Sequence, residues 1–325
     1  MESSSKTKYL ILGAVVSILT APIFVAWNTS AAIVLLIGQI GLFSAVTVSG
    51  FKLWHILVPL ISYGIGFSVT GDPLTAALAL VYVPVSAVIT ICLKKKLSRG
   101  VTVVLSAFTI GMVAFGCVVA TAFVNDVTVS ADGISEFLSV SAANVANSLV
   151  SEIPDSLFTN GLTREGYVRT IIEGLKYFSL SIVVLFCNLV AFSSTAVTKR
   201  AVLSLNDEES SIFGLSKNWL FVLSKPSAAV YIVCYLCLII GGETLTLPQQ
   251  IAFNTVMTAI QGGVFVMAFR HIRKRISVSG FAAIFMYIVV LYFLGLSAVA
   301  MVLSGVGLFA AFRQKSKEDN EKCEN

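Results

Sequence analysis

Side chains able to perform acid–base, nucleophilic or metal-assisted chemistry are rare in this 325-residue sequence. Its two histidines are His55 and His271, and the carboxylates Asp72 and Glu243 lie at the ends of apolar segments rather than within them. The HExxH, GxSxG and Walker A patterns do not occur, and no apolar segment contains a pair of aspartates. We therefore expect no catalytic residue, no metal site and no cofactor, and we predict that the protein is not an enzyme.

Neutral polar residues within the apolar segments are better candidates for a functional role. Gln39 and Gln261 both have glycine neighbours, and Asn254 lies seven residues before Gln261, so these two share a helix face. Such residues either line a ligand cavity or join helices by hydrogen bonds, and the second use is commoner. The glycines favour a cavity, because a close backbone approach or a broken helix often marks a binding region. Our candidate ligand-binding residues are Gln39, Asn188, Asn254 and Gln261.

Small residues recur every four positions in the first apolar segment, at Gly13, Ser17 and Ala21. Residues four apart lie on one helix face, and small side chains let two helix backbones approach closely. We therefore predict a helix-packing face here, used either within the protein or against a partner subunit.

The elements that must hold these residues are membrane-spanning helices. The sequence is 57% hydrophobic and 12% charged, with a mean hydropathy of +0.91, whereas soluble domains have about 25% charged residues. This composition excludes a soluble, disordered or collagen-like chain. The net charge of +5 does not indicate nucleic-acid binding, because Lys and Arg form short clusters between apolar segments. We expect the lipid bilayer, and no nucleic acid, as a partner.

The apolar segments predict an all-α fold, a polytopic transmembrane helical bundle of 8–10 spans. A helix needs about 20 apolar residues to cross the hydrocarbon core. Ten segments approach or exceed this length if the last is divided near Gly295, and eight remain if Leu53–Thr70 and a neighbour do not cross. Residues 1–312 would form a single transmembrane domain. The segments are Tyr9–Trp27, Ser30–Val48, Leu53–Thr70, Leu74–Leu93, Val101–Val124, Phe178–Val197, Ser227–Ile240, Gln250–Arg270 and the two halves of Phe281–Phe312.

The distribution of positive charge predicts which side of the bilayer each loop occupies. Of the 22 Lys and Arg residues, an arrangement with a cytoplasmic N-terminus leaves only Arg164, Arg169 and Lys176 outside. Short cytoplasmic loops of membrane proteins are enriched in Lys and Arg. We therefore predict that both termini are cytoplasmic and that residues 313–325 form a charged cytoplasmic tail.

An acidic extracytoplasmic segment is expected at 125–173. Apolar residues from Ile134 to Ile153 recur near helical spacing, which predicts an amphipathic helix that ends before Pro154. Thr163 is the expected N-cap of the helix that follows. The amphipathic helix could act as a mobile lid over the bundle or could pack on its neighbours as a surface helix, which is the commoner case.

A second long connection, 202–225, is predicted to be a cytoplasmic amphipathic loop. An acidic cluster at 207–209 is followed by apolar and aromatic residues interleaved with Lys217 and Lys225. This pattern suits a helix in the plane of the lipid headgroups, with Trp219 as an interfacial anchor. Pro226 is expected in the first turn of the next span, where the missing N–H costs no hydrogen bond.

The order of several features resembles that of a bacterial family. A basic turn at Lys94–Arg99 follows closely spaced early spans, Phe213–Pro226 leads into a later span, and Gln261-Gly262-Gly263 precedes the basic turn Arg270–Arg275. In these features the chain is similar to the YybS-like family of multi-pass membrane proteins, which is distantly similar to the substrate-binding components of energy-coupling-factor vitamin transporters. The resemblance implies small-molecule or cation-related uptake at a bacterial plasma membrane, powered by a separate ATPase and coupling subunit.

Two functions follow as hypotheses. The first is a small-molecule transporter or a substrate-capture subunit, with the four candidate residues lining its cavity and the 125–173 segment covering it. The alternative is a non-transporting scaffold of the bacterial envelope or of sporulation, which would bind cytoplasmic partners through the 202–225 loop and the 313–325 tail.

Overall fold

The structure is a computed structural model, and it describes residues 2–26, 30–48, 53–124, 128, 130–151, 153, 163–205, 219, 221–242, 244–276 and 297–313. Helices make up almost all of these ranges, which contain no strand, so the prediction of an all-α protein is confirmed. The predicted segment Phe281–Gly295, most of the 202–225 loop and the tail after Arg313 lie outside the described residues.

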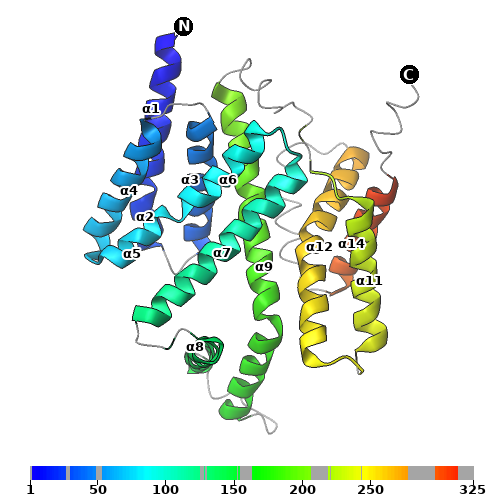
Figure 1. Cartoon of the computed structure of the whole chain (residues 1–325). Coiled ribbons are helices and arrows are strands. Elements are labelled where there is room, and N and C mark those ends of the chain that lie inside the picture. Colours follow the sequence, from blue (N-terminus) through cyan, green and yellow to red (C-terminus); the bar gives the residue numbers. More distant parts are fainter. Residues whose placement is uncertain are drawn as a thin grey trace.

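The predicted apolar segments that fall in the described residues are helical, although two are divided and Phe178–Val197 lies within the longer helix α9 (Figure 1). Six of the described helical stretches are long and apolar enough to cross a membrane, and three further apolar helices are shorter. The helices are α1 (Glu2–Ile18), α2 (Thr20–Val25), α3 (Ser30–Val48), α4 (Trp54–Thr70), α5 (Pro73–Ala77), the 3₁₀ turn η1 (Leu78–Leu80), α6 (Tyr82–Lys94), α7 (Arg99–Val124), α8 (Ala131–Ser151), α9 (Arg164–Leu205), α11 (Lys225–Gly241), α12 (Leu247–Ile276) and α14 (Ser297–Arg313). The structure thus supports a membrane protein with several spanning helices.

Two predicted helix starts are confirmed by their capping contacts. The Thr163 hydroxyl accepts a hydrogen bond from the N–H of Gly166 at 3.1 Å and begins α9. Pro226 lies in the first turn of α11, whose N-cap is Ser224. Both helix starts follow from local rules. A side-chain hydroxyl accepts a hydrogen bond from an N–H of the first turn, and a proline in that turn costs no backbone hydrogen bond.

The helices form two packed groups joined at α9 (Figure 1). In the first group, α1, α3, α4, α6, α7 and α9 share one apolar core. In the second, α11, α12 and α14 share a smaller core around Tyr231 and Val264. Helix α9 packs against α3 and α7 on one side and against α12 on the other.

Gly13, the first residue of the predicted small-residue face, lies at a close contact between two helices. A Cβ added at Gly13 would lie 2.8 Å from the ring of Trp54 on α4. Ser17 is buried, and its hydroxyl donates to the Gly13 carbonyl at 3.1 Å, while Ala21 is half-buried in α2. Gly13 therefore lies at a packing contact within the chain, between α1 and α4.

Helix α9 is much longer than a bilayer requires. Its 42 residues extend about 63 Å at 1.5 Å per residue, whereas the hydrocarbon core is about 30 Å thick. Its first turns therefore extend past the neighbouring helices. Helix α8 lies across this end of the molecule and packs on α9 (Figure 1).

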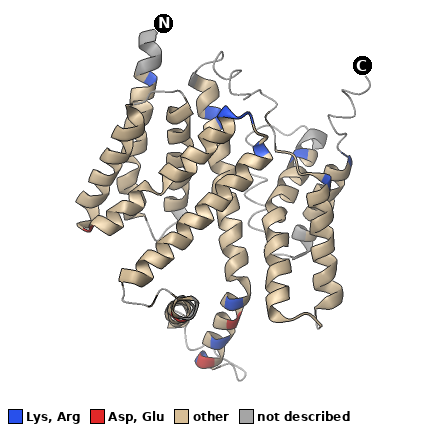
Figure 2. Cartoon of the chain, viewed as in Figure 1, with Lys and Arg blue, Asp and Glu red and all other residues tan. Residues whose placement is uncertain are grey.

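Charged side chains are separated between the two ends of the bundle. Figure 2 shows Lys and Arg gathered at the end where α1 begins and α14 finishes, around the turn Lys94–Arg99. The Asp and Glu side chains that Figure 2 colours, all among the described residues, lie at the opposite end, where the first turns of α9 carry both signs. This separation results from alternating helix directions, because the basic clusters lie at every second turn of the chain.

Candidate functional site

Gln39 lines a half-open cavity of about 520 Å³ between helices of the first group. Sites for small molecules usually have volumes of about 300–1,000 Å³, so this cavity falls in their range. Four elements supply its walls: α2, α3, the η1 region and α9. The lining residues are Thr20, Ile23, Phe24, Ala32, Ile33, Leu36, Gln39, Leu78, Ala79, Val81 and Phe186.

One wall of the cavity comes from a break in the first span. Helix α1 ends at Ile18 and α2 begins at Thr20. Pro22 explains the break, because a proline has no N–H to donate to the carbonyl four residues earlier and its ring clashes with that carbonyl. Here that carbonyl belongs to Ile18, the last residue of α1. Leu19, between the two helices, keeps helical dihedral angles, and Thr20 on the following turn lines the cavity.

The opposite wall comes from a second break with the same cause. The segment Leu74–Leu93, predicted as one span, is divided into α5, η1 and α6. Pro84 cannot donate to the carbonyl of Leu80, which is the last residue of η1. The cavity therefore lies between two proline-containing spans, each of which is interrupted only locally, because Leu19 and Val81 keep helical dihedral angles.

The cavity is mostly apolar, with two polar side chains that contact each other. Gln39 is 2% exposed, and its amide nitrogen donates to the Thr20 hydroxyl at 3.0 Å. A primary amide has a second N–H and a carbonyl oxygen, so Gln39 has hydrogen-bonding capacity beyond this contact. The arrangement suits a small, largely apolar molecule that carries one or two polar groups.

Asn188 and Asn254 lie elsewhere, at the interface of α9 and α12. The Asn254 amide donates to the Ser181 hydroxyl at 3.0 Å, and the Asn188 amide lies 3.5 Å from the carbonyl of Ala259. Phe186 lines the Gln39 cavity and is two residues before Asn188. Successive helix residues are rotated by about 100°, so the two side chains leave α9 on nearly opposite sides.

Gln261 is half-buried on α12 and does not line the Gln39 cavity. Two residues on, Gly263 allows a close contact, since an added Cβ would lie 2.9 Å from the ring of Phe221. The structure therefore brings Asn188 and Asn254 to one helix interface, places Gln39 at a cavity, and puts Gln261 at neither contact. A ligand for any of the four stays a prediction.

Thr20, Phe186 and Ala79 are cavity residues that the sequence analysis did not identify. The available signal was the position of proline, because Pro22 and Pro84 each predict a break four residues earlier. No signal in the sequence pairs Phe186 with residues more than a hundred positions away.

Trp219 packs among basic residues at the basic end of the bundle. This side chain is 8% exposed, and its indole N–H donates to the Leu97 carbonyl at 3.2 Å. The Arg99 guanidinium lies 4.5 Å from the ring centre of Phe192 and 5.8 Å from that of Trp219, while Lys199 donates to the Trp219 carbonyl at 3.1 Å. Trp219, expected at the lipid interface, is instead buried against protein.

No protein-family model matches this chain, and neither the curated proteins nor the solved structures contain a match to it. The resemblance to the YybS-like family and to energy-coupling-factor components therefore stays a prediction.

Proposed function

We propose that this chain is a multi-pass protein of a bacterial plasma membrane that transports a small molecule or captures it for a transport complex. The observation that supports this proposal is the Gln39 cavity, which has the volume of a small-molecule site and lies between two proline-containing spans. The proposal assigns the protein binding and movement of a molecule, and no chemical reaction.

The proposed topology has ten spans with both termini cytoplasmic. Six long and three shorter apolar helices among the described residues, together with the apolar segment Phe281–Gly295, give this number. The collection of Lys and Arg at one end of the bundle (Figure 2) supports a cytoplasmic location for that end.

The proposed substrate is a small apolar molecule with one or two polar groups. Apolar side chains of α2, α3 and η1 would surround its body, and Gln39 with Thr20 would bind its polar group. A separate ATPase and coupling subunit are the proposed partners, as the resemblance implies, because the sequence lacks a Walker A motif.

The test is affinity purification from the native host in mild detergent, followed by mass spectrometry of the bound small molecules and proteins. We expect wild type to retain a small molecule that Gln39→Leu loses. Ala79→Leu, which fills the cavity with a larger apolar side chain, should lose it as well. Asn254→Leu is the matched control, because it removes a buried amide outside the cavity, and it should retain the molecule.

Two outcomes would overturn the proposal. One is a wild-type protein that carries no small molecule and recruits no ATPase but copurifies with envelope or sporulation proteins, which would favour the scaffold hypothesis. The other is equal retention of the molecule by wild type, Gln39→Leu and Ala79→Leu, which would exclude this cavity as the site. Thermal unfolding of each variant establishes that it is folded.

A further inference from the structure

The Gln39 cavity lies at the depth of the bilayer hydrocarbon. Three of its walls are 12 or 13 residues from a lysine at the basic end of the bundle, which corresponds to about 18–20 Å at 1.5 Å per residue. The pairs are Thr20 with Lys8, Val81 with Lys94 and Phe186 with Lys199. Because the hydrocarbon core is about 30 Å thick, the cavity lies within it, in the half away from the basic end.

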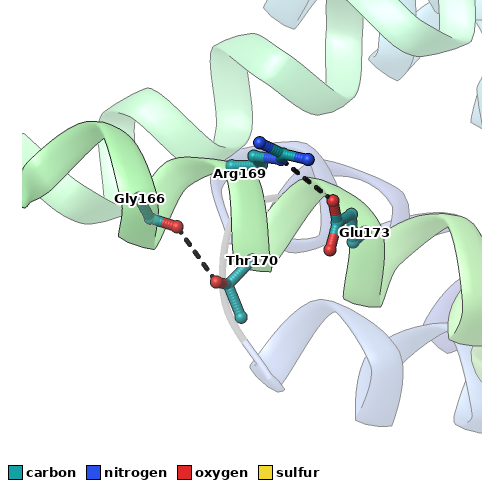
Figure 3. A network of polar contacts seen from close by, with 4 residues as sticks. All are labelled: Gly166, Arg169, Thr170 and Glu173. Carbon is teal, nitrogen blue, oxygen red and sulfur yellow. Dashed lines mark hydrogen bonds and ion pairs between the residues drawn. The ribbon is translucent and has the colours of Figure 1, made fainter. Parts of the chain in front are cut away.

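Charged residues on α9 give the same depth from the other side. The nearest of them to Phe186 toward the outer end is Lys176, ten residues earlier and about 15 Å away along the helix. Beyond it, Arg169 Nε and Glu173 form an ion pair at 3.1 Å, and the two side chains are 82% and 66% exposed (Figure 3). The charged and exposed turns of α9 therefore lie well outside the level of the cavity.

Phe186 forms part of the rim of this half-open cavity. Its side chain lines the cavity and is nevertheless 37% exposed. Ile182 and Leu189, about one turn before and after it on α9, are 55% and 46% exposed. Residues three and four apart share a helix face, so the three side chains form one exposed apolar strip. Apolar side chains exposed at this depth contact lipid chains, and the rim at Phe186 therefore borders lipid.

The lining of the cavity favours an uncharged molecule. None of the residues that line it in the described part of the chain is charged, and its polar side chains are Thr20 and Gln39. An unpaired charge in an apolar site costs far more free energy than a polar group that is hydrogen-bonded. A phosphate, carboxylate or ammonium group is therefore disfavoured. A hydroxyl, carbonyl or amide group can form hydrogen bonds with the Gln39 amide.

We propose that the substrate is an uncharged amphiphile dissolved in the membrane, and that it enters the Gln39 cavity sideways from the outer half of the bilayer, past Phe186. Its polar group would bind Gln39 and Thr20, while its hydrocarbon part would lie against the apolar walls. This inference rests on the proposed function, because it specifies the substrate class and the entry route of the same site. A water-soluble substrate would instead need a path from the end of the bundle.

The experiment is photolabelling of the full-length protein in phosphatidylcholine vesicles. The main probe is a long-chain alcohol with a diazirine on its alkyl chain, which dissolves in the bilayer. One comparison probe is the sulfonate of the same chain, and the other is a short-chain diazirine alcohol that stays in water. Mass spectrometry identifies the labelled residues. The test variants are Gln39→Leu and Ile33→Trp, which fills the cavity from α3, and the matched control is Asn254→Leu.

We expect the long-chain alcohol to label the residues that line the cavity in wild type and in Asn254→Leu. Gln39→Leu should need about two- to tenfold more probe for half-maximal labelling, because one hydrogen bond is lost, and Ile33→Trp should lose the labelling. An excess of the same alcohol without a diazirine should suppress labelling of the cavity in wild type. It should not suppress labelling of Ile182 and Leu189, which face lipid. This competition tests the site even if a variant does not fold.

Three results would overturn the inference. The first is a cavity that the long-chain alcohol does not label while Ile182 and Leu189 are labelled in the same vesicles. The second is equal labelling by the sulfonate, and the third is labelling of the cavity by the short-chain alcohol alone. If wild type still copurifies with a molecule that Gln39→Leu loses, these results exclude only the substrate class and the route. If wild type retains no molecule, the proposed function itself fails.

Discussion

Gly41 shows how a single residue determines the spacing of two helices. A Cβ added at Gly41 would lie 2.6 Å from the Val197 side chain on α9, and Thr198 donates to the Gly41 carbonyl at 3.2 Å. Lipid chains are as apolar as the helix surfaces, so packing and hydrogen bonds of this kind hold membrane helices together. The α3–α9 contact therefore depends on the missing side chain.

Gly41→Ala is expected to destabilise the protein by about 1–3 kcal/mol, because overpacking separates α3 from α9. Gly64→Ala is the control, since a Cβ there would meet no atom within 4 Å. The control should be neutral or stabilising by about 0.5–1 kcal/mol, as alanine favours a helix interior over glycine. Chemical denaturation in detergent measures both, and equal effects would contradict the proposed close contact.

Trp219 gives a second prediction at the residue scale. Trp219→Phe keeps a ring beside Arg99 but loses the donor to the Leu97 carbonyl, which should cost about 0.5–1.5 kcal/mol. Trp219→Ala also removes the buried ring and should cost about 3–5 kcal/mol. If thermal unfolding shows equal losses for the two variants, the ring is not packed as the structure has it.

At the scale of the element, proline positions determine where the spans are broken. Pro22 lies four residues after the end of α1, within the short helix α2 that lines the Gln39 cavity, and Pro84 lies four residues after the end of η1, which also lines it. Pro59, in contrast, lies within the single helix α4 and does not line the cavity.

Pro84→Ala is expected to join η1 and α6, because alanine supplies the N–H that the Leu80 carbonyl lacks. The helix should gain up to about 3 kcal/mol, while the protein should lose the copurifying small molecule. Pro59→Ala is the control and should gain stability without that loss. Unfolding curves and mass spectrometry of the same preparations test this, and retention of the molecule by Pro84→Ala would contradict the role of the break.

The N-cap of α5 predicts that the stability of the protein depends on pH. The Asp72 carboxylate accepts from the Thr75 N–H at 2.7 Å, and hydrogen bonds from Thr75 lower the pKa of Asp72 below its ordinary value. A lowered pKa means that the stabilisation is complete above the unfolded value, about 3.9, and disappears as the pH falls through the folded one. Asp72→Asn retains a capping oxygen without titration, so its stability relative to wild type should rise below about pH 4. Unfolding of both proteins is measured as a function of pH. If the stabilities of wild type and Asp72→Asn change equally as the pH falls, the Asp72 carboxylate does not cap α5.

At the scale of the whole molecule, the separation of charge predicts the orientation in the membrane. In a cysteine-free background, Glu165→Cys should react with a membrane-impermeant maleimide added to intact cells. Lys95→Cys, at the other end of the bundle, should react only after the cells are opened. The reverse pattern would show that the basic end faces outward and would overturn the proposed cytoplasmic location of the termini.

The sequence by itself determined those features of this protein that depend on residues close together in the chain. Long apolar segments predicted the helices, Thr163 and Pro226 predicted two of their starts, and the Lys94–Arg99 turn predicted where positive charge gathers. Segment length, capping and charge are local properties, because each depends on a few consecutive residues and on the thickness of the bilayer.

Only the tertiary structure decided which polar residues share a site. Gln39 meets Thr20 and faces Phe186, while Asn188, two residues from Phe186, turns toward α12. A span that is apolar on every side carries little periodic signal for its rotation about its own axis. The sequence therefore provided no reason to place Gln39 and Asn188 in different sites. The direction of each side chain follows from the packing of α9 between two helix groups, and that packing depends on contacts between residues far apart in the chain.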